Sequence, residues 1–148
     1  MEHIEQATAA DIPQLADLLT ILFTQEADFH PDREKQIRGL RLIVEAPDRG
    51  RIFVARTGDK IVGMVGLLFT ISTAEGAPAC LLEDMVVRPD QRGNGLGARL
   101  LQHAVSYATT NGFSRITLLT DRTNEKAIRF YQRHGFQPSE MTPLRLHL

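Results

Sequence analysis

The first residues of the chain have apolar and polar positions in an order that predicts a strand and two helices. Residues 3–7 alternate weakly, which favours a short strand. Apolar positions one helical turn apart predict a helix that extends to Phe23, capped by Thr8, with Asp11 in place of the glutamate of a capping box. Pro31 suits the first turn of a second helix that reaches Glu45.

The next apolar segments have the period and the turns of β-strands. Residues 51–57 and 60–73 are predicted strands joined by a two-residue Gly-Asp turn. Residues 61–69 are apolar at almost every position, so both faces of this strand are expected to be buried at the centre of a sheet. A further apolar run with β-branched residues ends at Val87 and is predicted as the next strand.

The second half of the chain has the order strand, helix, strand. Apolar positions one turn apart predict a long helix that ends at residues 111–112, an Asn-Gly pair. Residues 115–120 are the next predicted strand, parallel to the strand before the helix because a helix crosses over between them. Asn124 caps a short helix that Gly135 ends, and residues 144–148 are the candidate for a last strand.

This order of elements predicts an α+β (mixed α/β) fold in a single domain over residues 1–148. With 43% hydrophobic and 24% charged residues the composition is that of an ordinary soluble domain. A net charge of -1 gives no general attraction to nucleic acid or to anionic membranes, and no apolar run is long enough to span a bilayer. The first residues do not form a signal peptide, so we expect a cytoplasmic protein.

A glycine-rich bend connects the strand ending at Val87 to the long helix, with glycines at positions 93, 95 and 97. Glycine lets the backbone approach a ligand closely, and the first turn of a helix has unpaired N–H groups and the positive end of the helix dipole. Three arginines flank the bend: Arg88, Arg92 and Arg99. The bend is therefore a candidate binding site for a phosphate-bearing ligand.

Two families of phosphate-binding loops fit this bend poorly. Residues 93–98 match the G-x-G-x-x-G/A fingerprint of dinucleotide-binding folds, and Asp121 lies where the ribose-binding acid would be. In those folds the glycines follow the strand almost at once, whereas residues 88–92 intervene here, and the chain has no room for the second half of such a fold. A P-loop is excluded because no Gly-Lys-Ser/Thr closes the motif.

The same bend resembles a signature of the GCN5-related N-acetyltransferase (GNAT) superfamily. Residues 92–97 read R-G-N-G-L-G, which matches Q/R-x-x-G-x-G, and a hydrophobic strand ending Val-x-Pro precedes them as in that family. Residues 124–136 resemble the second signature of the family, an Asn, then Ala, then Phe-Tyr, then Gly-Phe. The resemblance, which covers residues 81–136, implies a mixed, mostly antiparallel sheet whose parallel strand pair splays apart around the pantetheine arm of acetyl-CoA.

The resemblance also implies which residues contact acetyl-CoA. The backbone of residues 85–87 is expected to pair with the pantetheine amides like an added strand, and the glycine bend to hold the phosphates. The expected contacts are Met85, Val86, Val87, Arg92, Gly93, Asn94, Gly95, Leu96, Gly97, Ala98, Asn124 and Ala127. Tyr131 is expected to protonate the departing CoA thiolate, although taken alone it would be a packing residue.

An amine acceptor has a pKa near 10.4 and must lose a proton before its nitrogen attacks a thioester. Glu83 is the candidate base, directly or through water. Glu83 and Asp84 are consecutive and would point to opposite faces of a regular strand, so Asp84 or a water molecule remains an alternative. This acidic pair resembles the polyamine acetyltransferase branch, which predicts a small cationic acceptor, with Glu26 and Asp28 near the mouth of the site.

The sequence thus predicts an acetyl-CoA-dependent N-acetyltransferase that acts on a primary amine of a small molecule by direct attack in a ternary complex. A protein lysine or N-terminal amine is the alternative acceptor, and a non-catalytic acyl-CoA-binding module is the alternative class. We expect no metal, nucleic-acid or membrane partner; a homodimer is common in the superfamily. Cys80, the one cysteine, is expected to be buried rather than an acyl carrier.

Overall fold

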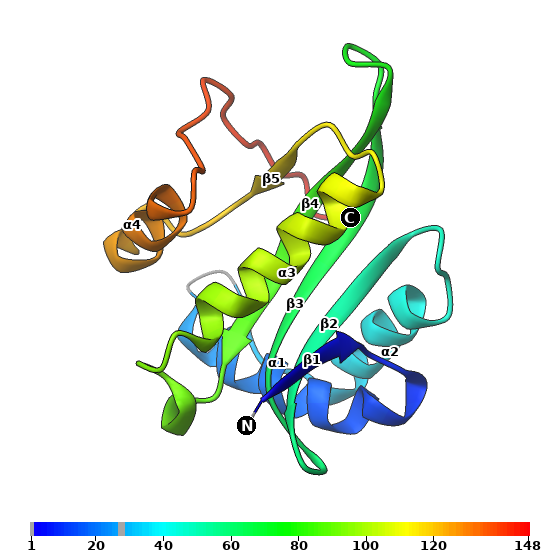
Figure 1. Cartoon of the computed structure of the whole chain (residues 1–148), viewed down its shortest axis with the longest axis vertical. Helices are drawn as coiled ribbons and strands as arrows, with labels where there is room; N and C mark the ends of the chain where they lie inside the picture. Colours follow the sequence, from blue (N-terminus) through cyan, green and yellow to red (C-terminus); the bar gives the residue numbers. More distant parts are fainter. Residues whose placement is uncertain (1, 27–28) are drawn as a thin grey trace.

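Five strands form one sheet with helices on both faces, in a computed structural model that describes residues 2–26 and 29–148 (Figure 1). The strands follow one another across the sheet in chain order: β1 (His3–Gln6), β2 (Gly50–Thr57), β3 (Lys60–Ser72), β4 (Ala77–Val87) and β5 (Ile116–Leu118). The helices are η1 (Ala9–Asp11), α1 (Ile12–Gln25), α2 (Arg33–Val44), η2 (Pro89–Gln91), α3 (Leu96–Thr110) and α4 (Glu125–Arg133). The mixed α+β class is therefore confirmed.

Neighbouring strands are antiparallel from β1 to β4, and β5 lies parallel to β4. The parallel pairing joins Cys80 to Ile116 and ends where Leu82 faces Leu118. Strand β4 continues to Val87 without β5, and Figure 1 shows the chain after β5 diverging from it. The predicted splayed parallel pair is confirmed, and among the described residues it leaves one edge of β4 without a neighbouring strand from Glu83 onward.

The core consists of two apolar layers, one on each face of the sheet. Helices α1 and α2 pack on one face with Ile52 and Val54, whereas α3 packs on the other with Phe53 and Ala55. Residues 61–67 of β3 are buried without interruption, as their apolar sequence predicted. Within the described residues, no helix has the length and apolarity to cross a membrane.

The start of α2 and the length of β5 differ from the sequence prediction. Helix α2 begins at Arg33 rather than at Pro31, because the carboxylate of Asp32 accepts a hydrogen bond from the Lys35 N–H (3.2 Å) and makes Asp32 the N-cap. Strand β5 has three residues, not the predicted six, because the chain turns away from β4 after Leu118 and a strand ends where its ladder ends.

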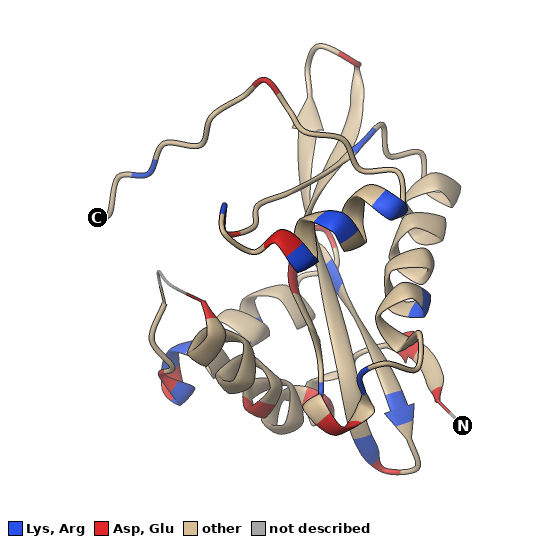
Figure 2. Cartoon of the chain, turned by 90° about the vertical axis from the view of Figure 1, so that its left-hand side faces the viewer, with Lys and Arg blue, Asp and Glu red and all other residues tan. Residues whose placement is uncertain are grey.

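Residues 144–148 were predicted as a last strand, and the structure contradicts this. They have no regular secondary structure, and Leu144 and Leu146 are 94% and 83% exposed. Figure 2 shows the C-terminal segment extending away from the sheet. Alternating leucines are typical of a strand, but a strand also needs a paired edge, and none lies beside this segment in the described part of the chain.

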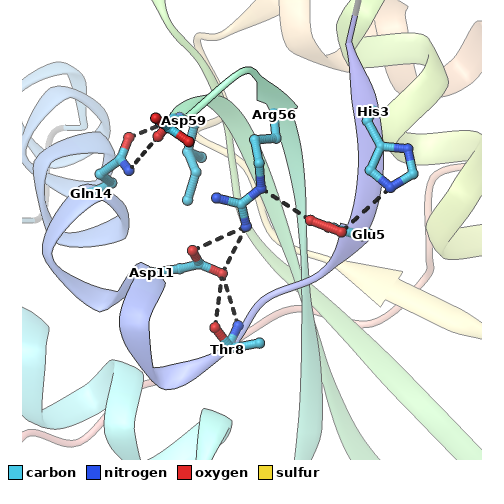
Figure 3. A network of polar contacts seen from close by, with 8 residues as sticks. His3, Glu5, Thr8, Asp11, Gln14, Arg56 and Asp59 are labelled. Atoms are coloured by element: carbon cyan, nitrogen blue, oxygen red, sulfur yellow. Dashed lines mark hydrogen bonds and ion pairs between the residues drawn. The ribbon is translucent and has the colours of Figure 1, made fainter.

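A polar network ties β1, the start of α1 and β2 together (Figure 3). Asp11 is 5% exposed, and its carboxylate accepts hydrogen bonds from the Thr8 N–H (2.9 Å) and from the Arg56 guanidinium (3.0 Å). Arg56 also donates to Glu5 (3.0 Å). The capping box predicted for Thr8 and Asp11 is present, and it caps η1, which leads into α1.

Replacing Asp11 by alanine is expected to destabilise the fold by about 2–3 kcal/mol, because it leaves Arg56 and the Thr8 N–H without their buried acceptor. Urea denaturation measures the change. Asp59→Ala is the matched control: the Asp59 side chain is exposed, and Gln14 bonds to the Asp59 backbone carbonyl, so a change within about 0.5 kcal/mol is expected. Equal losses in both variants would contradict a stabilising role for the network.

Candidate active site

A cavity of about 130 Å³ lies where β4 and β5 separate. It is lined by residues from the end of α1, from β4, from the segment after β5 and from α4. The polar or catalytic candidates among them are Glu26, Glu83, Asp84, Asp121, Asn124 and Tyr131, and the predicted acetyl-CoA contacts Met85 and Ala127 also line it. Segments about 100 residues apart in the chain thus meet in one place. Asp28, expected near the mouth, lies outside the described residues.

A β-bulge in β4 determines how the two consecutive acids are placed. Gly66 faces Glu83 and Met64 faces Val86, so Val65 alone lies opposite the two residues between them, Asp84 and Met85. Asp84 has a φ of 54°, which is rare for a residue with a side chain. Because a bulge interrupts the alternation of a strand, both acids line the same cavity. The expectation of opposite faces, which assumed a regular strand, is wrong here.

The cavity changes the ionisation of Asp84. Burial raises the pKa of its carboxyl to about 7, and the nearby carboxylates of Glu83 and Glu26 act in the same direction. Glu83 itself is exposed. A carboxyl with a pKa near 7 exchanges its proton at neutral pH, which is the property that a general base requires.

Tyr131 faces the cavity from α4, as its position in the sequence predicted. The Asn124 side chain caps this helix by accepting a hydrogen bond from the Ala127 N–H (3.1 Å), and Asn124 and Tyr131 line the same cavity. Burial, followed by the negative charge of Glu26, raises the pKa of the Tyr131 phenol to about 12. The phenol therefore keeps its proton at neutral pH. Phe130 packs against the core at 5.2 Å from the Tyr131 ring centroid.

The glycine bend lies beyond the C-terminal end of β4 and begins α3. Gly93 and Gly95 have φ values of 87° and 77°, a conformation that disfavours side chains, and Gly95 is the N-cap of α3. A β-carbon on Gly97 would lie 3.7 Å from the Met85 side chain, so the bend contacts the strand that lines the cavity. The first turn of α3 therefore has the unpaired N–H groups that a helix N-terminus offers to an anion.

The three arginines around the bend are less available than the sequence indicated. Arg99 forms an ion pair with Glu2 (3.1 Å), and Arg88 forms one with Asp90 (3.5 Å). Arg92 donates a hydrogen bond from Nε to the Val87 carbonyl (2.9 Å), which joins the bend to the end of β4. The positive potential of the site therefore depends on the helix N-terminus and Arg92 more than on a cluster of three cations.

Sequence reasoning gave too little weight to two residues. Asp84 was an alternative to Glu83, because only the bulge turns it into the cavity. Glu26 was expected only near the mouth, yet it lines the cavity and raises the pKa of both Asp84 and Tyr131. Cys80 is 1% exposed, and burial raises the pKa of its thiol to about 11, so it has little thiolate for nucleophilic attack.

Comparison with known proteins agrees with this geometry. The profile of the acetyltransferase (GNAT) family matches residues 12–136. The chain is 29% identical to the uncharacterized N-acetyltransferase YhfO of Bacillus subtilis (strain 168), over 91% of this chain and 89% of that protein. It also resembles the crystal structure of integron cassette protein HFX_CASS3, from the mobile metagenome of Cole Harbour Salt Marsh, with a TM-score of 0.84 and 30% identity over 98% of this chain and 90% of that chain. The chain belongs to the GNAT family of acetyltransferases.

Proposed function

We propose that this acetyltransferase transfers the acetyl group of acetyl-CoA to a primary amine of a small molecule, by direct attack of the amine on the thioester in a ternary complex. The observation that carries the proposal is the presence in one small cavity of Asp84 and Tyr131, whose pKa values are about 7 and about 12. Aminolysis of a thioester needs a group that accepts a proton at neutral pH and a group that donates one.

The glycine bend after β4 and the unpaired edge of β4 suit two parts of acetyl-CoA, the diphosphate and the pantetheine arm. The left-handed glycines and the N-terminus of α3 form a cradle for the diphosphate. The edge of β4 that lacks β5 can pair with the pantetheine amides as with an added strand. We assign residues 85–87, 92–98, Asn124 and Ala127 to this binding. When bound, acetyl-CoA supplies the activated acyl group.

The proton transfers balance with the residues present. The acceptor arrives as an ammonium ion and loses one proton to Asp84. Its nitrogen forms a bond to the thioester carbonyl carbon while the carbon–sulfur bond breaks, and Tyr131 donates a proton to the leaving sulfur. The second nitrogen proton passes through solvent to the Tyr131 phenolate, and Asp84 releases its proton to solvent when the products leave. We assign the base to Asp84 rather than Glu83, because Asp84 is the more buried acid and titrates near neutral pH.

Acetyl-CoA is expected to stabilise the folded protein by about 2.7 kcal/mol at 100 times its dissociation constant, whereas NAD is not. Thermal melting with each ligand measures this. Gly95→Val should abolish the shift, since the side chain obstructs the phosphate cradle. Gly112→Val is the control: its φ of 78° matches the 77° of Gly95, so the backbone strain is alike, but it lies at the other end of α3 and should keep the shift. An equal shift with NAD would contradict the proposal.

The turnover number with saturating amine is expected to rise with pH to a plateau above about pH 7, as Asp84 loses its proton. Asp84→Asn should lower turnover about 100-fold and remove this inflection. Glu83→Gln should keep turnover and move the inflection to lower pH, because the Glu83 charge raises the Asp84 pKa. Loss of the inflection in Glu83→Gln instead would assign the base to Glu83.

The contribution of Asp84 to the free energy of unfolding is expected to fall as pH rises, in contrast to the turnover number. The folded-state pKa of Asp84 lies above its ordinary value of 3.8, so the stability that its proton contributes is complete below pH 3.8 and is lost as pH rises through about 7. Thermal melting should therefore show that Asp84→Asn gains stability relative to the parent protein between these values. A constant difference across this window would contradict a raised pKa.

Tyr131→Phe removes one oxygen and keeps the ring, so the fold and acetyl-CoA affinity should change little. We expect turnover to fall about 100-fold, the lower end of the range for loss of an acid, because a thiolate is a fair leaving group. Tyr107→Phe makes the same change in a tyrosine that packs against Phe53 and Phe69 outside the cavity, and it should keep full turnover. Steady-state kinetics compares the two; parent-like turnover of Tyr131→Phe would leave Tyr131 as a packing residue.

A further inference from the structure

Asp84 lies between two cavities. Besides the catalytic cavity it lines a groove of about 290 Å³ between α1 and α2. We call this the acceptor groove; its apolar lining consists of Leu19, Phe23, Phe29, Leu40 and Ile43. The Phe23 and Phe29 rings are 5.5 Å apart between centroids and form one end of this lining. A molecule in the groove would present one end to the carboxyl of Asp84 and the rest to apolar side chains.

Besides Asp84, the polar residues that line the acceptor groove are His30, Asp32, Lys35 and Gln36, and they give a second ammonium ion little to bind. Gln36 is buried, and its amide donates to the Ala16 carbonyl (2.9 Å) while its oxygen accepts from the Asp32 N–H (2.8 Å). The Asp32 carboxylate caps α2 and has Lys35 beside it in the lining. The Arg145 guanidinium lies 5.9 Å from the centroid of Phe29. The described lining thus holds two acids, Asp32 and Asp84, and Lys35 offsets the charge of Asp32.

Gly39 keeps the acceptor groove open. It lies in the middle of α2, where glycine weakens a helix relative to alanine, and it lines the groove. A β-carbon built on Gly39 would have no heavy atom within 4 Å, so packing does not require glycine there. A side chain at position 39 would therefore occupy space within the groove.

We propose that the acceptor groove binds the uncharged alkyl or aryl body of the acceptor, with the reacting nitrogen at Asp84. The substrate class is then an apolar primary amine rather than the diamine or polyamine that the Glu83–Asp84 pair suggested. This inference rests on the proposed acetyl transfer.

Hexylamine and 1,5-diaminopentane test the substrate class, because they have equal numbers of heavy atoms and differ by a terminal methyl group or ammonium ion. We expect kcat/KM to be at least tenfold higher for hexylamine, measured by thiol release from acetyl-CoA. A preference for the diamine would overturn the inference and leave acetyl transfer intact. Acetylation of neither amine, nor of ethylamine, would contradict the proposed function and the inference together.

Gly39→Leu tests the location. Filling the acceptor groove should lower the ratio of kcat/KM for hexylamine to that for ethylamine at least tenfold, while the melting temperature does not fall, since leucine favours the helix. Arg38→Leu places the same side chain on the neighbouring, exposed position of α2 and should leave the ratio unchanged. An unchanged ratio in Gly39→Leu would overturn the inference.

Discussion

Parallel hydrogen bonding between β4 and β5 lasts from Cys80 to Leu82, and the site exists because it stops there. Had the pairing continued, the edge of β4 from Glu83 to Val87 would be occupied by its neighbour, with no cavity and no backbone left for a ligand. Strand β4 is held on its other edge by β3 and against the helical layers, so it stays extended after β5 leaves. The fold thus exposes backbone groups without losing the strand that carries them.

The β-bulge at Asp84 lies in the part of β4 that continues beyond its pairing with β5. A regular strand would place Glu83 and Asp84 on opposite faces, whereas the bulge lets both line the catalytic cavity and lets Asp84 also border the acceptor groove. Its positive φ is unfavourable for a residue with a β-carbon. Pairing of β3 with β4 on both sides of the bulge holds this conformation in place.

The carboxyl groups of the cavity shift the pKa values of its residues, and their mutual repulsion lowers the stability of the fold. Glu26, Glu83 and Asp84 bring three carboxyl groups to one small space, and burial adds to their repulsion. The result is one acid that titrates near neutral pH and a tyrosine that keeps its proton. At the opposite edge of the sheet, the buried carboxylate of Asp11 is paired with Arg56. The shifted pKa values of Asp84 and Tyr131 are typical of a functional site.

The sequence alone determined the features that depend on local pattern. Apolar periodicity placed the helices and most strands, three alternate glycines marked the phosphate bend, and Asn124 to Tyr131 spanned two helical turns on one face. Tertiary structure decided the rest. The length of β5, the bulge at Asp84 and the pairing of Asp11 with Arg56 depend on contacts between residues distant in the chain, which local periodicity does not encode. Residues 144–148 are a further case in which local pattern is not enough. Their alternating leucines are typical of a strand but do not determine the edge to which a strand must bond.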